Sequence, residues 1–160
     1  MHKTPESKRV EDSHTEQVHI LSPPDLNGYD RLFGGKLMEW MDIVAGVVAR
    51  RHSECNVTTA LVDTLQFKGP AYTNETIALT GRITHVGNTS MEVCVTTYVE
   101  ELTRHRRLIN KAYVVLVALD ENEAPTRVPR LILETELEKK EFEDAERRSA
   151  YRKLRLAENF

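Results

Sequence analysis

The sequence has few of the residues that mark secreted or membrane-spanning chains. Cys55 and Cys94 are its only cysteines, which is too few for a disulfide framework and fits a reducing compartment. No apolar run approaches the ~18 residues that would span a bilayer. Residues 1–12 are polar and charged, without the apolar stretch of a signal peptide. We therefore expect a cytoplasmic protein with no membrane partner.

A strong charge of one sign is also missing. The formal net charge is -3, from 22 Lys and Arg against 25 Asp and Glu, so no basic field indicates a nucleic-acid partner. His52 and Cys55 are separated by two residues, but no second pair completes a zinc site. There is no G-x-S-x-G motif, which argues against an α/β-hydrolase, and Gly34-Gly35-Lys36 lacks the spacing of a phosphate loop. We expect no metal.

The length of 160 residues is that of one domain with additions at its ends. Residues 1–15 are expected to form a flexible N-terminal arm, and residues 16–133 the folded domain. Residues 134–160 begin with glutamates and continue with arginines and lysines, a polarity that suits a helix macrodipole. We expect a charged C-terminal helix or tail there, docked on its own or on a neighbouring subunit.

One segment has the pattern of a buried helix. In residues 36–51 apolar side chains cover almost every side of the helical wheel. Asp42, Ala45, Gly46 and Ala49 form a stripe of small residues that begins with a carboxylate. Small residues let a ligand or another backbone approach closely, and glycine inside a helix needs such a reason.

The rest of the domain has the period-two pattern of strands. Strands are predicted for residues 16–21, 58–67, 75–86, 89–101 and 109–119. A helix that is apolar all round cannot lie on an open sheet, because its outer side would meet water. A strongly curved antiparallel sheet around the helix solves this, and a second subunit can complete the cover. The predicted class is α+β.

Several blocks of residues along the chain resemble those of a known family. Residues 27–42, N-G-Y-D-R-L-F-G-G-K-L-M-E-W-M-D, resemble the signature of hotdog-fold acyl-CoA thioesterases of the brain acyl-CoA hydrolase type and its bacterial relatives. The similarity continues through residues 51–53, 57–60, 67–70, 87–93, 117–120 and 128–129, and spans about residues 18–155. One departure is Asp30, where many relatives carry glycine.

The resemblance implies a hotdog fold, in which a curved antiparallel sheet wraps around one long central helix. It implies a dimer or a trimer of dimers, with active sites at the dimer interface. It also implies hydrolysis of acyl-CoA to a free acid and coenzyme A, with no cofactor beyond the coenzyme A of the substrate. The family's catalytic carboxylate corresponds to Asp42 and its loop asparagine to Asn27.

These residues suit thioester hydrolysis. Asp42 can act as a general base on water, or attack the thioester directly as a nucleophile. Gly34 and Gly35 lie where the helix begins, so their unpaired N–H groups can stabilise an oxyanion, and Asn27 can add a side-chain donor or hold the water. Glu39, one turn before Asp42, is the rival base.

Grip on coenzyme A needs hydrogen-bond donors and cations. The turn of residues 87–90, which leads into a predicted strand, offers hydrogen-bond donors, and basic side chains can pair with phosphates. Arg50 and Arg51 are two candidate cations of this kind. The residues expected to bind coenzyme A are Thr58, Thr59, Lys68, Arg82, Gly87, Asn88, Thr89 and Ser90.

Three other functions are alternatives to thioester hydrolysis. A hotdog hydratase or dehydratase generally pairs its carboxylate with a histidine, and no histidine occurs in residues 22–35 or on the helix before His52. A non-catalytic acyl-CoA-binding regulator needs a partner domain, and none is visible in the sequence. A purely structural role for residues 134–160 predicts that their deletion weakens assembly.

Overall fold

The structure, a computed structural model, describes residues 4–160. Its elements in chain order are β1 (Ser7–Arg9), η1 (Val10–Ser13), β2 (Thr15–Ile20), η2 (Pro23–Asp25), α1 (Gly34–Ser53), β3 (Asn56–Phe67), β4 (Thr76–Val86), β5 (Ser90–Glu100), β6 (Arg106–Leu119), β7 (Arg130–Ile132) and α2 (Glu136–Glu158). Within the described residues, no helix combines the length and apolar character needed to cross a membrane.

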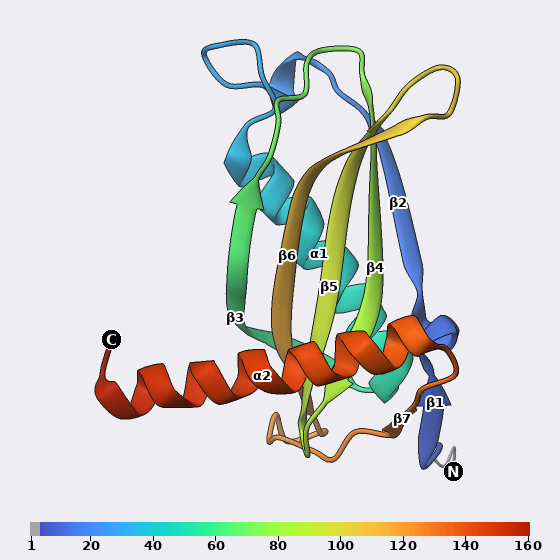
Figure 1. The fold of residues 1–160 in the computed structure, drawn as a ribbon, viewed down its shortest axis with the longest axis vertical. Helices are drawn as coiled ribbons and strands as arrows, with labels where there is room; N and C mark the ends of the chain where they lie inside the picture. The colour runs from blue at the N-terminus through green and yellow to red at the C-terminus, as the bar shows by residue number, and fades with distance from the viewer. Residues whose placement is uncertain (1–3) are drawn as a thin grey trace.

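The main sheet has five antiparallel strands in the order β2-β4-β5-β6-β3 (Figure 1). The long strands β4, β5 and β6 lie at its centre, and β2 and β3 are its edges. The predicted strands agree with this sheet to within a few residues, and the α+β architecture of a hotdog fold, a curved sheet with one long helix against it, is confirmed.

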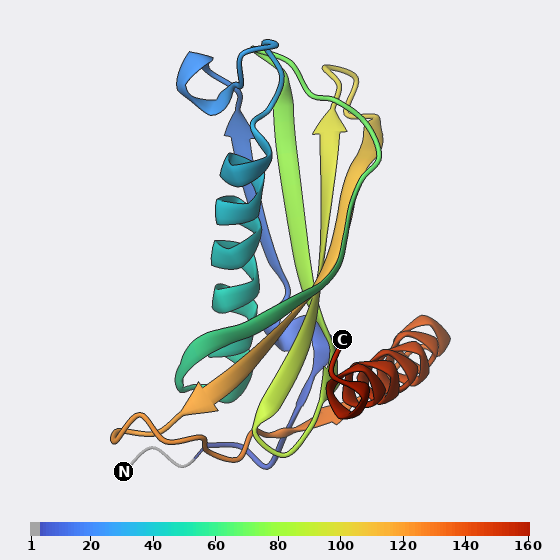
Figure 2. The same ribbon diagram turned by 90° about the vertical axis from the view of Figure 1, so that its left-hand side faces the viewer.

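Helix α1 lies along one face of the sheet (Figure 2). Val44 and Val48 are fully buried against β4, and at Gly81 a Cβ atom would stand 2.6 Å from Val44 Cγ1. Only glycine allows this approach. Farther along the helix, the Trp40 ring stacks on His19 of β2, with ring centroids 3.9 Å apart and planes 5° apart.

One side of α1 is left uncovered by residues 4–160 of its own chain. Met38 and Ile43 are 45% and 46% exposed, and an added Cβ at Gly46 would meet nothing within 4 Å. Ala45 and Ala49 are buried, whereas Asp42 is exposed. The stripe of small residues is therefore divided between the sheet and the open side, and the wrapping expected from the sequence is incomplete in a single chain.

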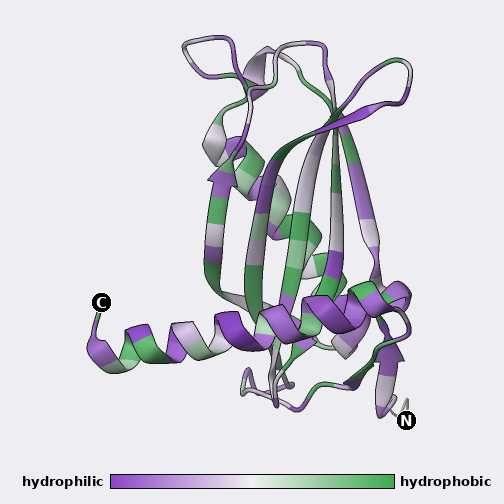
Figure 3. Cartoon of the chain, in the orientation of Figure 1, coloured by the Kyte–Doolittle hydropathy of each residue, from purple (hydrophilic) through white to green (hydrophobic). Residues whose placement is uncertain are grey.

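Helix α2 lies on the opposite face of the sheet and runs across its strands (Figures 1 and 2). It begins at the capping residue Thr135, whose side chain accepts a hydrogen bond from the Glu138 backbone while the Glu138 carboxylate reaches back. Its surface is mostly hydrophilic (Figure 3). The charged C-terminal helix expected over residues 134–160 is therefore present and packs on its own sheet.

The N-terminal segment differs from the flexible arm expected over residues 1–15. Residues 1–3 lie outside the described part. Beyond them, β1 pairs in parallel with β7, and Val10 and Ser13 in η1 are buried. Three-residue strands carry no readable periodicity, so only this long-range pairing reveals that the segment packs on the domain.

Candidate active site between α1 and β3

A groove of about 440 Å³ runs between α1 and β3. Its lining residues are Asp42, Ile43, Gly46, Val47 and Arg50 from the helix, Asn56, Val57 and Thr59 from β3, and Leu116 from β6. Polar and apolar side chains share the lining about equally, and the polar groups lie on facing elements, with Asp42 and Arg50 on the helix and Asn56 and Thr59 on β3.

Asp42 is fixed by a contact across the groove. The Thr59 hydroxyl donates a hydrogen bond of 2.7 Å to Asp42 Oδ1, which leaves Oδ2 for another partner. Asp42 is brought to this position by its helical phase, because Asp42, Gly46 and Arg50 follow one another at four-residue intervals and all line the groove. The carboxylate and hydroxyl predicted from sequence are therefore brought together, although both are exposed in the single chain.

Arg50 and Asn56 occupy another part of the groove. Arg50 Nη2 donates to Asn56 Oδ1 at 3.1 Å, so the guanidinium is held in the groove. Asn56 was missed by sequence analysis, although the helical interval from Asp42 to Arg50 could have directed attention to this end of the groove. Arg51 points elsewhere and binds the His14 carbonyl and the Thr15 hydroxyl.

Asn27 organises the loop before α1. Its Oδ1 accepts hydrogen bonds from the backbone N–H groups of Tyr29 and Arg31, at 2.9 and 3.3 Å. Asp30 has φ 57°, a left-handed conformation that Asp tolerates and that glycine adopts freely. The loop thus keeps a glycine-like turn at the departure noted in the sequence. Within the described chain, no hydrogen bond engages Asn27 Nδ2, so this amide remains available as a donor.

Gly34 and Gly35 open α1, where backbone N–H groups have no partner inside the helix. A Cβ at Gly35 would stand 2.6 Å from the Phe33 ring, and one at Gly34 would stand 3.4 Å from the Phe67 ring. The space beside these two glycines, where a substrate was expected to approach, is occupied by the two aromatic rings, which are 53% and 55% exposed.

A single chain does not bring all the predicted catalytic residues together. Asn27, Gly34 and Gly35 are absent from the lining of the groove. Asp42 follows Gly34 by eight residues, or about 12 Å along the helix axis. One chain therefore supplies a carboxylate in the groove and, separately, backbone and amide donors at the N-terminal end of α1.

The predicted coenzyme A residues are scattered. Thr58 and Lys68 are exposed near opposite ends of β3. Arg82 lies on the other face of the sheet in an ion pair with Glu141, which raises the pKa of its guanidinium. The turn of residues 87–90 is at the end of the sheet, where the carbonyls of Asn88 and Thr89 accept from the backbone of Val128 and Ala118. Of these residues, only Thr59 lines the groove.

The structure shows no metal cluster among residues 4–160, since no three His, Cys, Asp or Glu side chains converge there. The chemistry that the groove can support is that of a carboxylate oriented by a hydroxyl, with a cation and an amide at its side.

Comparison with known sequences gives a consistent group of relatives. The family described as "Thioesterase superfamily" matches residues 29–104. The chain is 37% identical to the "Uncharacterized acyl-CoA thioester hydrolase YkhA" of Bacillus subtilis over 85% of this chain and 80% of that protein. It is 35% identical to the "Cytosolic acyl coenzyme A thioester hydrolase" of Rattus norvegicus over 90% of this chain, but spans only 39% of that longer protein.

Solved structures agree with these relatives. The crystal structure of an apo-hexameric acyl-CoA thioesterase superposes with a TM-score of 0.90 at 38% identity, covering 94% of this chain and 97% of that one. The acyl-CoA hydrolase of Staphylococcus aureus, in complex with butyryl coenzyme A, coenzyme A and coenzyme A disulfide, also gives 0.90 at 29% identity, with 96% and 94% covered. Alanine mutants of that hydrolase at an asparagine, an aspartate and a threonine superpose similarly.

Proposed function

Because the chain belongs to the thioesterase superfamily and is an acyl-CoA thioester hydrolase, we propose that Asp42 is the residue that activates water in its active site. The observation that carries this proposal is the hydrogen bond from Thr59 to Asp42 in the groove between α1 and β3. With Oδ1 held by the hydroxyl, Oδ2 is the atom that takes the proton of a bound water.

The reaction follows from this arrangement. As Asp42 Oδ2 accepts a proton, the water oxygen bonds to the thioester carbon and the carbonyl oxygen becomes an oxyanion. The carbon–sulfur bond then breaks, the free acid forms, and the proton passes from Asp42 to the departing thiolate of coenzyme A. General-base assistance of this kind is typically worth ~10²–10⁴-fold in rate. Direct attack by Asp42 on the thioester carbon is the alternative route open to the same carboxylate.

The oxyanion needs donors, and we assign them to a second copy of the chain. Asn27 Nδ2 and the N–H groups of Gly34 and Gly35 are free to donate, but lie along the helix from the groove of their own chain. Within residues 4–160 no strand pairs with the outer edge of β3, and the open side of α1 is adjacent to it. A two-fold pairing of copies through β3 sets the two α1 helices antiparallel and brings the donor end of one toward the groove of the other.

The hexameric state of solved thioesterases supports such an assembly, as a dimer or a trimer of dimers. The spacing of the key residues supports their roles. Asn27, Asp42 and Thr59 have the same separations in sequence as the asparagine, aspartate and threonine replaced in the S. aureus hydrolase. We assign all three residues to the catalytic site on this basis.

The substrate class is an acyl-CoA. The binding of butyryl coenzyme A and coenzyme A by the S. aureus hydrolase supports this. In this chain Arg50 is the cation in the groove, and we propose it as a partner of a coenzyme A phosphate in place of Arg82, which is paired with Glu141. The reaction as written needs no cofactor. A cytoplasmic location is proposed from the sequence and from the cytosolic relative.

The decisive experiment is Asp42→Asn, assayed by release of free thiol from acyl-CoAs between acetyl and palmitoyl. We expect turnover to fall at least ~10²-fold, because the proton acceptor is lost while the shape of the side chain is kept. Glu39→Gln is the matched control. Glu39 lies one turn earlier on α1 and pairs with Lys36 at 3.4 Å outside the groove, so its turnover should remain normal. Near-normal thiol release by Asp42→Asn would refute the assignment.

The same assay separates hydrolysis from hydration. Among residues 4–160, no histidine lines the groove between α1 and β3. Crotonyl-CoA should therefore release thiol, and should not lose its double bond while the thioester stays intact.

A further inference from the structure

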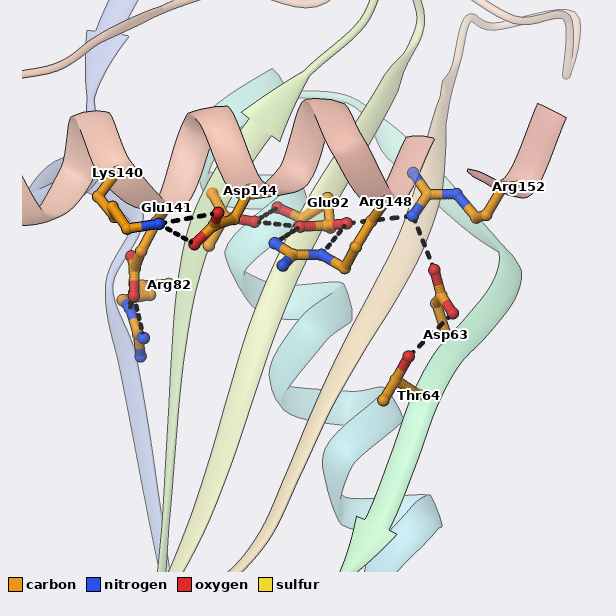
Figure 4. A network of polar contacts seen from close by, with 10 residues as sticks. Asp63, Thr64, Arg82, Glu92, Lys140, Glu141, Asp144, Arg148 and Arg152 are labelled. Atoms are coloured by element: carbon orange, nitrogen blue, oxygen red, sulfur yellow. Dashed lines mark hydrogen bonds and ion pairs between the residues drawn. The ribbon is translucent and has the colours of Figure 1, made fainter. Parts of the chain in front are cut away.

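Helix α2 is fastened to its own sheet by buried ion pairs (Figure 4). The Glu92 side chain on β5 is 1% exposed and pairs with Arg148 at 2.8 Å and Arg152 at 3.2 Å. Arg152 also binds Asp63 on the edge strand β3 at 3.0 Å, and Arg148 lies 3.6 Å from the centre of the Tyr113 ring. These contacts fix the direction in which the helix crosses the sheet.

The face of α2 that contacts the sheet continues past the edge strand β3. Ala145, Arg148 and Arg152 lie on this face at intervals of three and four residues. Leu156 comes four residues after Arg152 and continues the same face. Phe160 lies two residues beyond the end of the helix at Glu158 and lines one hollow with Leu156. Yet they are 79% and 81% exposed. Figure 1 shows why, since the C-terminal end of α2 extends beyond β3.

We call this extension, residues 153–160, the overhang. Beside it is a hollow of about 260 Å³, lined by Leu61, Val62 and Asp63 of β3 and by Arg152, Arg155, Leu156 and Phe160. Leu61 and Val62 are 37% and 44% exposed. The hollow therefore joins apolar side chains of the overhang to the unpaired edge of the sheet, a combination that natural proteins usually cover.

We propose that the overhang docks on the outer sheet face of a second copy of this chain, paired along β3. This inference rests on the proposed function, which needs a second copy at the same edge. The direction of α2 is set by the ion pairs at Glu92 and Asp63, so whatever covers Leu156 and Phe160 must continue the surface of the sheet past β3. A sheet joined at β3 does this. By symmetry, each copy then receives the overhang of the other.

The test is the double variant Leu156→Asp with Phe160→Asp in the full chain, followed by sedimentation over a range of concentrations. We expect the dissociation constant of the dimer to rise at least ~10-fold, because two apolar side chains can no longer be buried. Leu137→Asp is the matched control. Leu137 is 66% exposed at the opposite end of α2, and its replacement should leave the dimer unchanged. Circular dichroism and urea unfolding show whether each chain folds.

The outcomes are distinct. An unchanged dissociation constant in the folded double variant overturns the proposal. If that variant does not fold, Leu156→Ala with Phe160→Ala removes the same contact without adding charge, and unchanged assembly of this pair overturns it equally. Unchanged assembly with lost binding to phosphatidylcholine–phosphatidylserine vesicles would make the occupant a lipid surface. Normal turnover by Asp42→Asn refutes the catalytic proposal alone, since sedimentation is measured without substrate.

Discussion

At the scale of single residues, the contact between Thr59 and Asp42 joins an edge strand to the helix beside it. A hydroxyl that donates to a carboxylate fixes the orientation of that carboxylate. The contact therefore sets which carboxylate oxygen faces the groove, and it is the part of the site whose removal is easiest to interpret.

Thr59→Val keeps the shape of the side chain and removes the donor. We expect kcat to fall about 10–100-fold, since a hydrogen bond to a charged group is worth ~1.5–3 kcal/mol. Thr59→Ser restores the hydroxyl and should restore kcat. An unchanged kcat in Thr59→Val would mean that the contact only supports the fold.

Stability should depend on pH through His52. This side chain is buried, its Nε2 lies 2.9 Å from the Pro129 carbonyl, and burial lowers its pKa below the ordinary value of 6.5. On acidification the unfolded chain takes up this proton at a higher pH than the folded chain does, so unfolding becomes more favourable below that value.

The corresponding measurement is the free energy of unfolding in urea at about pH 7.5 and about pH 5.5. It should be lower at the acidic pH, and the decrease should be smaller in His52→Gln, which can still donate to Pro129 but does not titrate. Equal decreases in the two proteins would exclude His52 as a source. Burial also lowers the pKa of His19 and His85, so part of the decrease should remain in the variant.

At the scale of elements, α2 is attached through charge rather than through an apolar face. Glu92 is the centre of this attachment, because it is almost fully buried and pairs with two arginines. Removal of one member of a buried ion pair is costly, since the remaining charges lose their compensation.

We expect Glu92→Gln to lower the free energy of unfolding by roughly 3 kcal/mol, the lower end for such a loss, because both guanidinium groups keep some contact with water. Lys140→Gln is the control. It breaks a surface pair with Asp144 on the same helix and should leave the urea midpoint unchanged. Equal midpoints in the two variants would show that the buried pairs add nothing to stability.

The sequence predicted the long elements well, because helix and strand periods are visible over ten residues or more. It missed β1 and β7, whose three-residue lengths carry no period. It also placed Arg82 with coenzyme A, because the choice between a ligand and Glu141 depends on where α2 docks. At the candidate site, Asp42 was predicted as the catalytic carboxylate and Thr59 as a coenzyme A contact, and the structure places both side chains in one groove. Asn56 was missed because the predicted strand began at residue 58, whereas β3 begins at Asn56, which lines the groove.

At the scale of the whole molecule, neither copy is expected to be active alone. Asp42, the proposed base, and the proposed oxyanion donors lie apart in one chain, and we propose that they meet across a two-fold interface. The open side of α1 and the free edge of β3 are the surfaces that such an interface would cover.

Mixed dimers test this sharing. If Asp42→Asn and Asn27→Ala chains are co-expressed, half of the dimers are mixed, and each mixed dimer has one intact site and one doubly altered site. A quarter of all sites are then intact, so thiol release should reach about a quarter of the wild-type value. This activity should exceed the mean of the activities of the two variants measured separately. Activity equal to that mean would place Asn27 and Asp42 of one chain in the same site.

The stacking of His19 on Trp40 gives the molecule an internal optical reporter. Trp40 is the only tryptophan, so all indole emission arises from one ring, two residues before Asp42 on α1. A protonated imidazole quenches indole emission on contact, and burial keeps the pKa of His19 below its ordinary value. The signal should therefore be bright at neutral pH, and any ligand that shifts α1 against β2 should change its intensity without an added dye.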